Sequence, residues 1–422
     1  MPHTLPNPNP WMILPFGVLL VGIALMPLLA GKWWLKHYAK VSFALGAVTL
    51  GYYLIGLQAH HRVLDVAHEY VSFIALIGSL FIVSGGIHIA VKGESTPFAN
   101  VIFLLVGALI ANVLGTTGAS MLLIRPWIRM NKYRITAHHI VFFIFIVSNV
   151  GGCLTPIGDP PLFLGYLQGV PFWWVLKNCW PMWGVGVGIL LAMFYVVDRI
   201  NFTRAPREVR EMETAHETWK FQGLANLLFL AAIIGAVFIK QPAFLREAIM
   251  VAAALGSYFT TSKQIHESNH FNFHPIKEVA ILFVGIFATM IPALDWLGRN
   301  ASELLGQNPA PGLFFWGSGS LSSVLDNAPT YLSFFSALFG AASPDQVPSL
   351  LTQSQAALIG ISIGSVFFGA NTYIGNGPNF MVKSIADQQK IRTPTFLGYI
   401  FKYTLPFMLP MLVVVWWVFF RK

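Results

Sequence analysis

The sequence predicts an all-α membrane protein of about 10 transmembrane helices plus two re-entrant hairpins, arranged as an inverted repeat with two broken helices. The composition is apolar, since 55% of the 422 residues are hydrophobic and only 10% are charged, whereas a soluble domain carries about 25% charged residues. A polar motif rich in glycine and proline occurs twice. Finally, the basic residues gather on one side of the membrane in only one of two topologies.

Ten apolar segments are long enough to be membrane spans, counting each broken helix as one. In chain order these spans are 11–30, 41–57, 69–91, 137–170, 172–197, 221–239, 243–261, 278–297, 351–390 and 395–420. Polar loops are expected between the first three spans, with Lys32, Lys36 and Lys40 in one and His60, His61, Arg62 and Asp65 in the next. The predicted domains are an N-terminal two-span segment (1–66), a first transporter repeat (67–197), a charged connector with two spans (198–276) and a second, inverted repeat (277–422).

The span at 137–170 contains a stretch that a continuous membrane helix would not carry. Ser148 to Leu164 reads SNVGGCLTPIGDPPLFL, with glycines, prolines and Asp159 in its middle. Proline removes a helix hydrogen bond, and a carboxylate at membrane depth is costly unless something pairs with it. We therefore expect a helix that breaks inside the membrane, with its freed carbonyls and Asp159 facing a polar cavity.

The same motif returns in the second half of the chain. TPIGDPPLFL, which contains Asp159, matches TYIGNGPNFM, which contains Asn376, in register. A second pair of polar segments precedes these, because VLGTTGAS at 113–120 parallels VLDNAPTY at 324–331. Two such motifs repeated in the same order indicate an internal duplication.

The segments 98–129 and 312–338 either cross the membrane or enter it and turn back. If both cross, the Lys and Arg residues divide almost evenly between the two sides. If both are hairpins and the N-terminus lies outside, the cytoplasmic side collects most of them, as expected of cytoplasmic loops. The hairpin arrangement is therefore predicted, and it gives the two repeats opposite orientations. In that arrangement the basic residues left outside are Arg62, Lys177, Lys240, Arg246, Arg299, Arg421 and Lys422.

Two aspartates are the leading candidates for chemistry. Asp326 lies at the tip of the second hairpin, where it could bind a cation, carry a proton or cap the following helix. Its intramembrane position favours the functional interpretation. Asp159 could equally cap the half-helix that starts at Pro160 or act as a ligand, and both roles are compatible.

Neutral oxygens accompany these carboxylates. Hydroxyl, amide and freed backbone oxygens suit a hard cation such as sodium, so Asp326 and Asp159 are the expected metal ligands. His138 and His139 are expected at the membrane edge, solvated rather than sensing pH. No pattern indicates a zinc site, a catalytic triad or a phosphate loop, so neither catalytic residues nor a cofactor are expected. The full set of ion- or substrate-binding candidates is Thr116, Thr117, Asn149, Thr155, Asp159, Asp326, Asn327, Asn371, Thr372, Asn376 and Asn379.

The motifs SNVGGCLTPIGDPP, GTTGAS and VLDNAPT resemble those of the ion-transporter superfamily, which includes NhaD-type sodium/proton antiporters, arsenite-pump membrane subunits, and citrate and dicarboxylate symporters. The resemblance covers both repeats and is nearest to sodium/proton antiporters and citrate transporters. It implies a homodimer, each protomer having a scaffold and a moving transport domain that works by an elevator motion. The ion-site motifs of the superfamily map onto Thr116, Thr117, Asp159, Asp326, Asn327, Thr372 and Asn376.

One departure from the resemblance bears on substrate. Dicarboxylate symporters of this group carry Ser-Asn-Thr at both hairpin tips, whereas this chain has Gly-Thr-Thr-Gly and Asp-Asn-Ala-Pro, with no arginine in either motif. Asp326 would repel a free carboxylate substrate, although a metal–citrate complex could bind through its metal.

We therefore expect a secondary transporter, not an enzyme, that exchanges sodium for protons at a midplane site. Two alternatives stay open: a cation-coupled citrate or other organic-anion transporter, and a membrane subunit that needs a partner ATPase. Sodium and protons would be the transported or coupling ions. The expected location is a bacterial inner membrane with both termini outside. The net charge of +9 is assigned to cytoplasmic loops and not to nucleic-acid binding.

Overall fold

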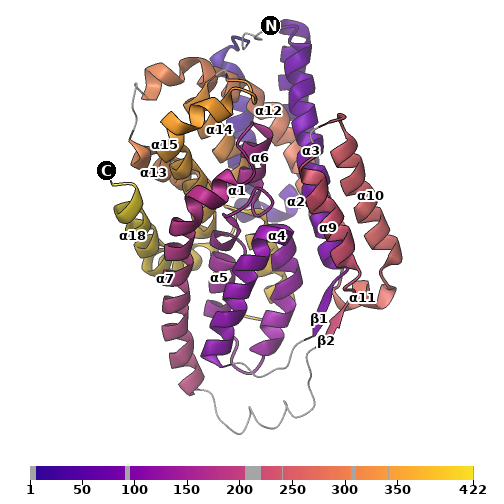
Figure 1. Cartoon of the computed structure of the whole chain (residues 1–422), viewed down its shortest axis with the longest axis vertical. Helices are drawn as coiled ribbons and strands as arrows, with labels where there is room; N and C mark the ends of the chain where they lie inside the picture. Colours follow the sequence, from indigo (N-terminus) through magenta and orange to yellow (C-terminus); the bar gives the residue numbers. More distant parts are fainter. Residues whose placement is uncertain are drawn as a thin grey trace.

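The computed structural model describes residues 6–90, 96–204, 220–239, 241–305, 310–340 and 342–421. The described chain is almost entirely helical (Figure 1), and eight of its helices are long and apolar enough to cross a membrane. An all-α membrane protein is thus confirmed.

The first half of the chain forms η1 (Pro10–Ile13), α1 (Leu14–Leu29), α2 (Gly31–Gly51), the π-helix η2 (Tyr52–Gly56), α3 (His60–Gly85), β1 (His88–Ala90), α4 (Pro97–Met130), α5 (Ala137–Ile146), η3 (Val150–Gly152), α6 (Pro160–Leu167) and α7 (Trp174–Arg204).

The second half repeats the succession of hairpin and broken helix. It forms β2 (Lys220–Gln222), α9 (Asn226–Val237), α10 (Leu245–Thr260), α11 (Lys263–Ser268), α12 (His274–Leu305), α13 (Pro311–Ser322), α14 (Asn327–Phe339), α15 (Val347–Phe368), η4 (Gly369–Asn371), α16 (Gly377–Gln388), α17 (Phe396–Tyr399), the π-helix η5 (Ile400–Met408) and α18 (Leu409–Phe419).

Several predicted boundaries are wrong. Helix α2 begins at Gly31, so the expected loop with three lysines is part of a helix. Helix α3 begins at His60 because this segment has tertiary partners: Val66 is buried and Arg62 pairs with Asp295. Helices α9 and α10 have 12 and 16 residues, fewer than the about 20 of a full span.

A short antiparallel ribbon of β1 and β2 was not predicted, and it pairs His88 with Gln222. Of the predicted charged connector, 198–204 belongs to α7 and 205–219 lies outside the described residues.

Helix α4 is a hairpin rather than a single span. Its backbone leaves the helical region at Gly115, where φ is 74°, a conformation that favours glycine. Asn100, near one end, donates a hydrogen bond of 2.8 Å to Asn131, 31 residues later near the other end. A straight helix would separate these residues by about 46 Å. The predicted hairpin at 98–129 is confirmed, because the chain enters and leaves at the same end.

The second predicted hairpin is formed by α13 and α14. The ring centroids of Phe314 and Phe334 are 6.5 Å apart, and a Cβ on Gly317 would lie 3.0 Å from Phe334. Both predicted broken helices are also present, since α5 and α6 are separated by 147–159 and α15 and α16 by 369–376. After its two histidines, helix α5 is apolar on every side, and its residues from Ile140 to Ile146 are fully buried at the centre of the molecule.

The first helices of the two repeats, α3 and α12, run in opposite directions, as predicted. Arg62 near the start of α3 pairs with Asp295 in the second half of α12 at 2.8 Å. Phe81 near the end of α3 packs on Phe271, just before α12, with centroids 5.5 Å apart. Helices α3 and α12 are therefore antiparallel, and each leads into its own hairpin. Figure 1 shows α4 in one half of the molecule and α13 with α14 in the other.

Candidate functional site

Asp159 lies where the two hairpin tips and the two helix breaks meet, and it is 1% exposed. Its Oδ1 accepts hydrogen bonds from the Thr116 hydroxyl at 2.7 Å and from Asn376 Nδ2 at 3.0 Å. Its Oδ2 accepts one from Asn327 Nδ2 at 2.5 Å. Thr116 and Asn327 occupy matching places in the two hairpin motifs, and Asn376 is the counterpart of Asp159 itself. Donors from three elements thus converge on a carboxylate carried by a fourth, the first break.

The Asp159 side chain accepts hydrogen bonds from other elements and does not act as a helix cap. Asp159 sits at the N-cap position of α6, but its carboxylate accepts no capping hydrogen bond from that helix. Asn376 likewise leaves α16 uncapped by its side chain. Its amide instead reaches Asp159 and the Ser148 carbonyl, the latter at 3.2 Å. Both residues after the breaks therefore direct their side chains across the repeat boundary.

Thr155 and Thr372 hold the two breaks in place by matching pairs of hydrogen bonds. The Thr155 hydroxyl donates to the Asn112 carbonyl at 2.6 Å, and the Thr372 hydroxyl donates to the Ser323 carbonyl at 2.6 Å. Each hydroxyl also accepts from the N–H of the glycine three residues later, at 3.1 Å in both repeats. The two threonines therefore fasten each break to its own hairpin, so their hydroxyls are committed to protein partners.

Three further predicted asparagines lie in the same network. Asn149 Nδ2 donates to Asn379 Oδ1 at 2.7 Å, and Asn379 Nδ2 donates to the Thr372 carbonyl at 2.8 Å. Asn371 donates to the Ser323 hydroxyl at 2.9 Å, while its buried Oδ1 has no hydrogen-bond partner among the described residues. These side chains brace the second break next to Asp159.

Asp326 and Thr117 do not join the hydrogen bonds around Asp159. Asp326 is half-buried and caps α14, because its Oδ1 accepts the N–H of Ala328 at 3.0 Å. Thr117 lines a cavity of about 20 Å³ between α3 and the tip of the first hairpin. Such a volume holds about one water-sized occupant. The apolar side chains Leu76 and Leu80 close this cavity on the α3 side.

Asp159 has no basic side chain as a partner in the part of the chain that the structure describes. Within the described ranges, no lysine or arginine forms an ion pair with Asp159 or Asp326. The three donors to Asp159 are neutral, and Asn327 keeps a buried Oδ1 without a hydrogen-bond partner in the described chain. A buried carboxylate of this kind calls for a cation or a proton to neutralise it.

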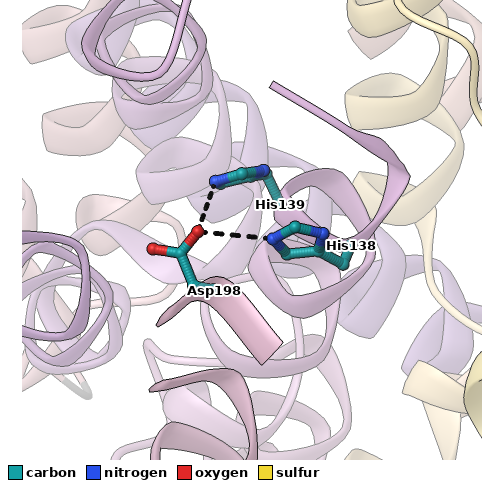
Figure 2. Close-up of side chains that lie close together, drawn as sticks. All are labelled: His138, His139 and Asp198. Atoms are coloured by element: carbon teal, nitrogen blue, oxygen red, sulfur yellow. Dashed lines mark hydrogen bonds and ion pairs between the residues drawn. The ribbon is translucent and has the colours of Figure 1, made fainter. Parts of the chain in front are cut away.

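A second buried polar group, here called the base cluster, consists of Arg134, His138, His139 and Asp198. The Arg134 guanidinium pairs with both oxygens of Asp198. Figure 2 shows both imidazoles directed at that carboxylate, with His139 Nε2 at 3.0 Å and His138 Nε2 at 3.4 Å from Oδ1. The expectation of solvated histidines at the membrane edge is wrong, since His138 is 8% and His139 0% exposed. Packing of α5 against α7, which sequence spacing does not reveal, buries them.

The base cluster fits a structural ion pair better than a metal site. The two imidazoles and Asp198 offer ligand atoms within 4.8 Å of one another. Arg134, however, already occupies both carboxylate oxygens, and a guanidinium repels an adjacent metal ion. The N–H of Thr136 donates to His139 Nδ1 at 3.2 Å, so the neutral ring carries its proton on Nε2 and donates to Asp198.

Sequence reasoning missed one residue of the site, Asn112. Its Nδ2 donates to the Gly151 carbonyl at 2.7 Å and its Oδ1 accepts the N–H of Leu154 at 2.8 Å. The signal was available, because Asn112 directly precedes the first hairpin motif and its counterpart Ser323 precedes the second. Its carboxamide satisfies backbone groups that the broken helix leaves free.

Comparisons with known proteins agree with this architecture. A family model described as "Putative citrate transport" matches residues 6–420. Two proteins of Mycobacterium tuberculosis, from strains CDC 1551 and H37Rv, are each 22% identical over 319 residues, which is 69% of this chain and 73% of the relative. Both are described as uncharacterized transporters.

Proposed function

Because this chain belongs to the citrate-transport family whose model spans nearly all of it, and is thus a transporter, we propose that it is a secondary active transporter whose coupling ion binds at Asp159. One observation carries the proposal: a buried carboxylate receives hydrogen bonds from both hairpins and from the second break, yet has no basic partner in the described chain. A sodium ion or a proton would neutralise it, and the two would compete for the same oxygens.

Sodium/proton exchange is the form of transport that the chemistry of the site favours. The available ligands are carboxylate, amide and hydroxyl oxygens, which suit a hard monovalent cation. The cavity beside Thr116 and Thr117 has a volume of about 20 Å³, which is enough for one water-sized occupant. The hairpin motifs contain no arginine that could pair with a carboxylate substrate.

Cation-coupled citrate transport is the second candidate, and the description of the family favours it directly. Citrate would have to approach two aspartates without an arginine to pair with, which is unfavourable for the free anion. A complex of citrate with a metal ion avoids this difficulty, since its metal could face Asp326. In this second candidate, binding of the ion at Asp159 would be coupled to transport of the metal–citrate complex.

The transport step that we propose is a rigid-body motion of the elevator type, in a homodimer placed in a bacterial inner membrane with both termini outside. Opposed hairpins and broken helices of two inverted repeats are the architecture in which alternating access can occur around a fixed site. The chain would then act as a carrier and not as an enzyme.

Transport in proteoliposomes separates the two candidates. The vesicles contain a pH dye and receive sodium pulses with and without citrate, and uptake of labelled citrate is measured in parallel. Sodium/proton exchange predicts a pH change on adding sodium alone. A pH change that requires citrate would overturn it in favour of citrate transport, and no flux of either kind would refute both.

A further inference from the structure

Side-chain hydrogen bonds divide the described chain into two bodies. We call residues 6–90, 220–239 and 241–305 the scaffold body, and residues 96–204, 310–340 and 342–421 the transport body. Between described residues of these bodies, two side-chain hydrogen bonds cross the boundary. Tyr166 donates its hydroxyl proton to the Val237 carbonyl at 2.8 Å, and Gln168 Nε2 donates to Glu69 Oε1 at 2.8 Å.

Apolar contacts also cross the boundary between the two bodies. Phe172 packs on Phe238 with ring centroids 4.6 Å apart, and Leu80 lies against the first hairpin tip. Apolar surfaces in a membrane can slide past one another without breaking directional bonds. Hydrogen bonds are directional, and one to a charged group is among the stronger kinds. The two bonds therefore define one relative position of the bodies.

Both bonds originate at the C-terminal end of α6. This helix has 8 residues and begins directly after Asp159, so Gln168 lies about 13 Å along the helix from the site. A tilt of α6 at the site end would move its other end against the scaffold body. Glu69, when released, would still be attracted by Arg62 on the same helix.

We propose that Gln168 and Tyr166 form a docking latch, which holds the transport body at one of its two positions and opens once in every transport cycle. The inference rests on the rigid-body motion in the proposed function. Gln168 and Tyr166 are positioning residues, because they touch neither Asp159 nor its hydrogen-bond partners. Their effect is on the balance between the two positions, and not on ion binding itself.

Reversible crosslinking tests the latch. The variant Glu69→Cys with Gln168→Cys is treated with a short bifunctional methanethiosulfonate, while Cys153 and Cys179 stay unreactive because they are buried. Asn178→Cys with Gln355→Cys is the matched control, since these amides form a 2.5 Å hydrogen bond within the transport body. We expect the linked latch pair to lose at least about tenfold in flux and to recover on reduction, with no loss in the linked control. Full flux in the linked latch pair would overturn the proposal.

A distance measurement judges the latch even if the proposed function fails. Spin labels are placed at Leu228 in the scaffold body and Trp180 in the transport body, which are both exposed. Gln168→Ala should raise the share of a second distance about tenfold relative to the first, the change that loss of one hydrogen bond to a charged group produces. Gln355→Ala should leave the distribution unchanged. One identical distance in the unmodified chain and in Gln168→Ala, with and without sodium, would refute the latch.

Discussion

Replacing Asp159 by Asn should abolish ion coupling without unfolding the protein. The carboxamide oxygen can keep the bonds from Thr116 and Asn376, which both reach Oδ1. The new amide group would face Asn327 Nδ2, its neighbour at 2.5 Å in the unmodified chain. A half-turn of the Asn327 amide resolves this clash, because it presents the Oδ1 that has no hydrogen-bond partner among the described residues. The number of hydrogen bonds is then preserved and a buried charge is removed.

The magnitudes follow from these contacts. We expect the free energy of unfolding of Asp159→Asn to stay equal or to rise by about 1–3 kcal/mol, the usual gain from removing an uncompensated buried group. Asp159→Ala instead leaves the Thr116 hydroxyl and the Asn327 amide without their acceptor, while Asn376 keeps the Ser148 carbonyl, and should destabilise by about 2–6 kcal/mol. Apparent sodium affinity of Asp159→Asn should fall by about 100-fold or more, because a buried ionic contact contributes about 3 kcal/mol.

Thermal unfolding measures the change in stability, and the sodium-driven pH change in proteoliposomes measures the change in sodium affinity. Asp345→Asn serves as the control, since Asp345 is exposed and far along the chain from either break. Sodium affinity of Asp159→Asn equal to that of the unmodified protein would refute Asp159 as the ion ligand. Equal destabilisation by Asn and Ala would refute the compensating turn of the Asn327 amide.

Three further predictions follow from the same structure. Asp326→Asn should keep the cap of α14, since Asn caps helices as well as Asp does, and coupled exchange should persist because the coupling ion is placed at Asp159; loss of exchange would add Asp326 to the ion site. Asp198→Asn breaks the buried pair with Arg134 and should lower the free energy of unfolding by about 3–5 kcal/mol. Denaturant unfolding in detergent measures this change. A loss below about 1 kcal/mol would contradict the interpretation of the base cluster as a structural ion pair. Lys263 and Asp345 are both exposed, and each is replaced by cysteine in a separate variant. An impermeant external thiol reagent should fail to label the cysteine at 263 and should label the one at 345. The reverse pattern would mean that the topology is inverted.

The architecture was predictable because its signals are local. Clusters of glycine and proline inside apolar segments mark the breaks, and the distribution of basic residues selects hairpins over spans. The repeat alignment also anticipated that Thr116 and Asn327 are equivalent, and the structure places both on Asp159. The proposed domain boundaries and the ion-binding roles of the candidate residues stay predictions.

The parts that sequence could not supply depend on tertiary contacts. The base cluster joins His138 to Asp198 across 60 residues, and no spacing rule links the start of one helix to the end of another. The N-terminal extension of α3 likewise depends on Arg62 finding Asp295 in α12. The sequence also did not decide whether Asp159 or Asp326 has its carboxylate buried at the centre of the site, because both lie in a polar tip or break of similar composition.

The choice between those aspartates follows from an asymmetry within the symmetric fold. At the first hairpin tip the chain has Gly115 with positive φ, and at the matching place in the second it has Asp326 at an ordinary helix start. The glycine lets that tip approach the break, where a Cβ would lie 3.2 Å from the Ile157 carbonyl. Asp326 begins a helix and its carboxylate is used for the cap. The two breaks differ as well, because Asn376 is neutral where Asp159 is charged. The two repeats are thus matching frames with one buried carboxylate at their shared centre, which is the physical basis for proposing that the coupling ion binds there.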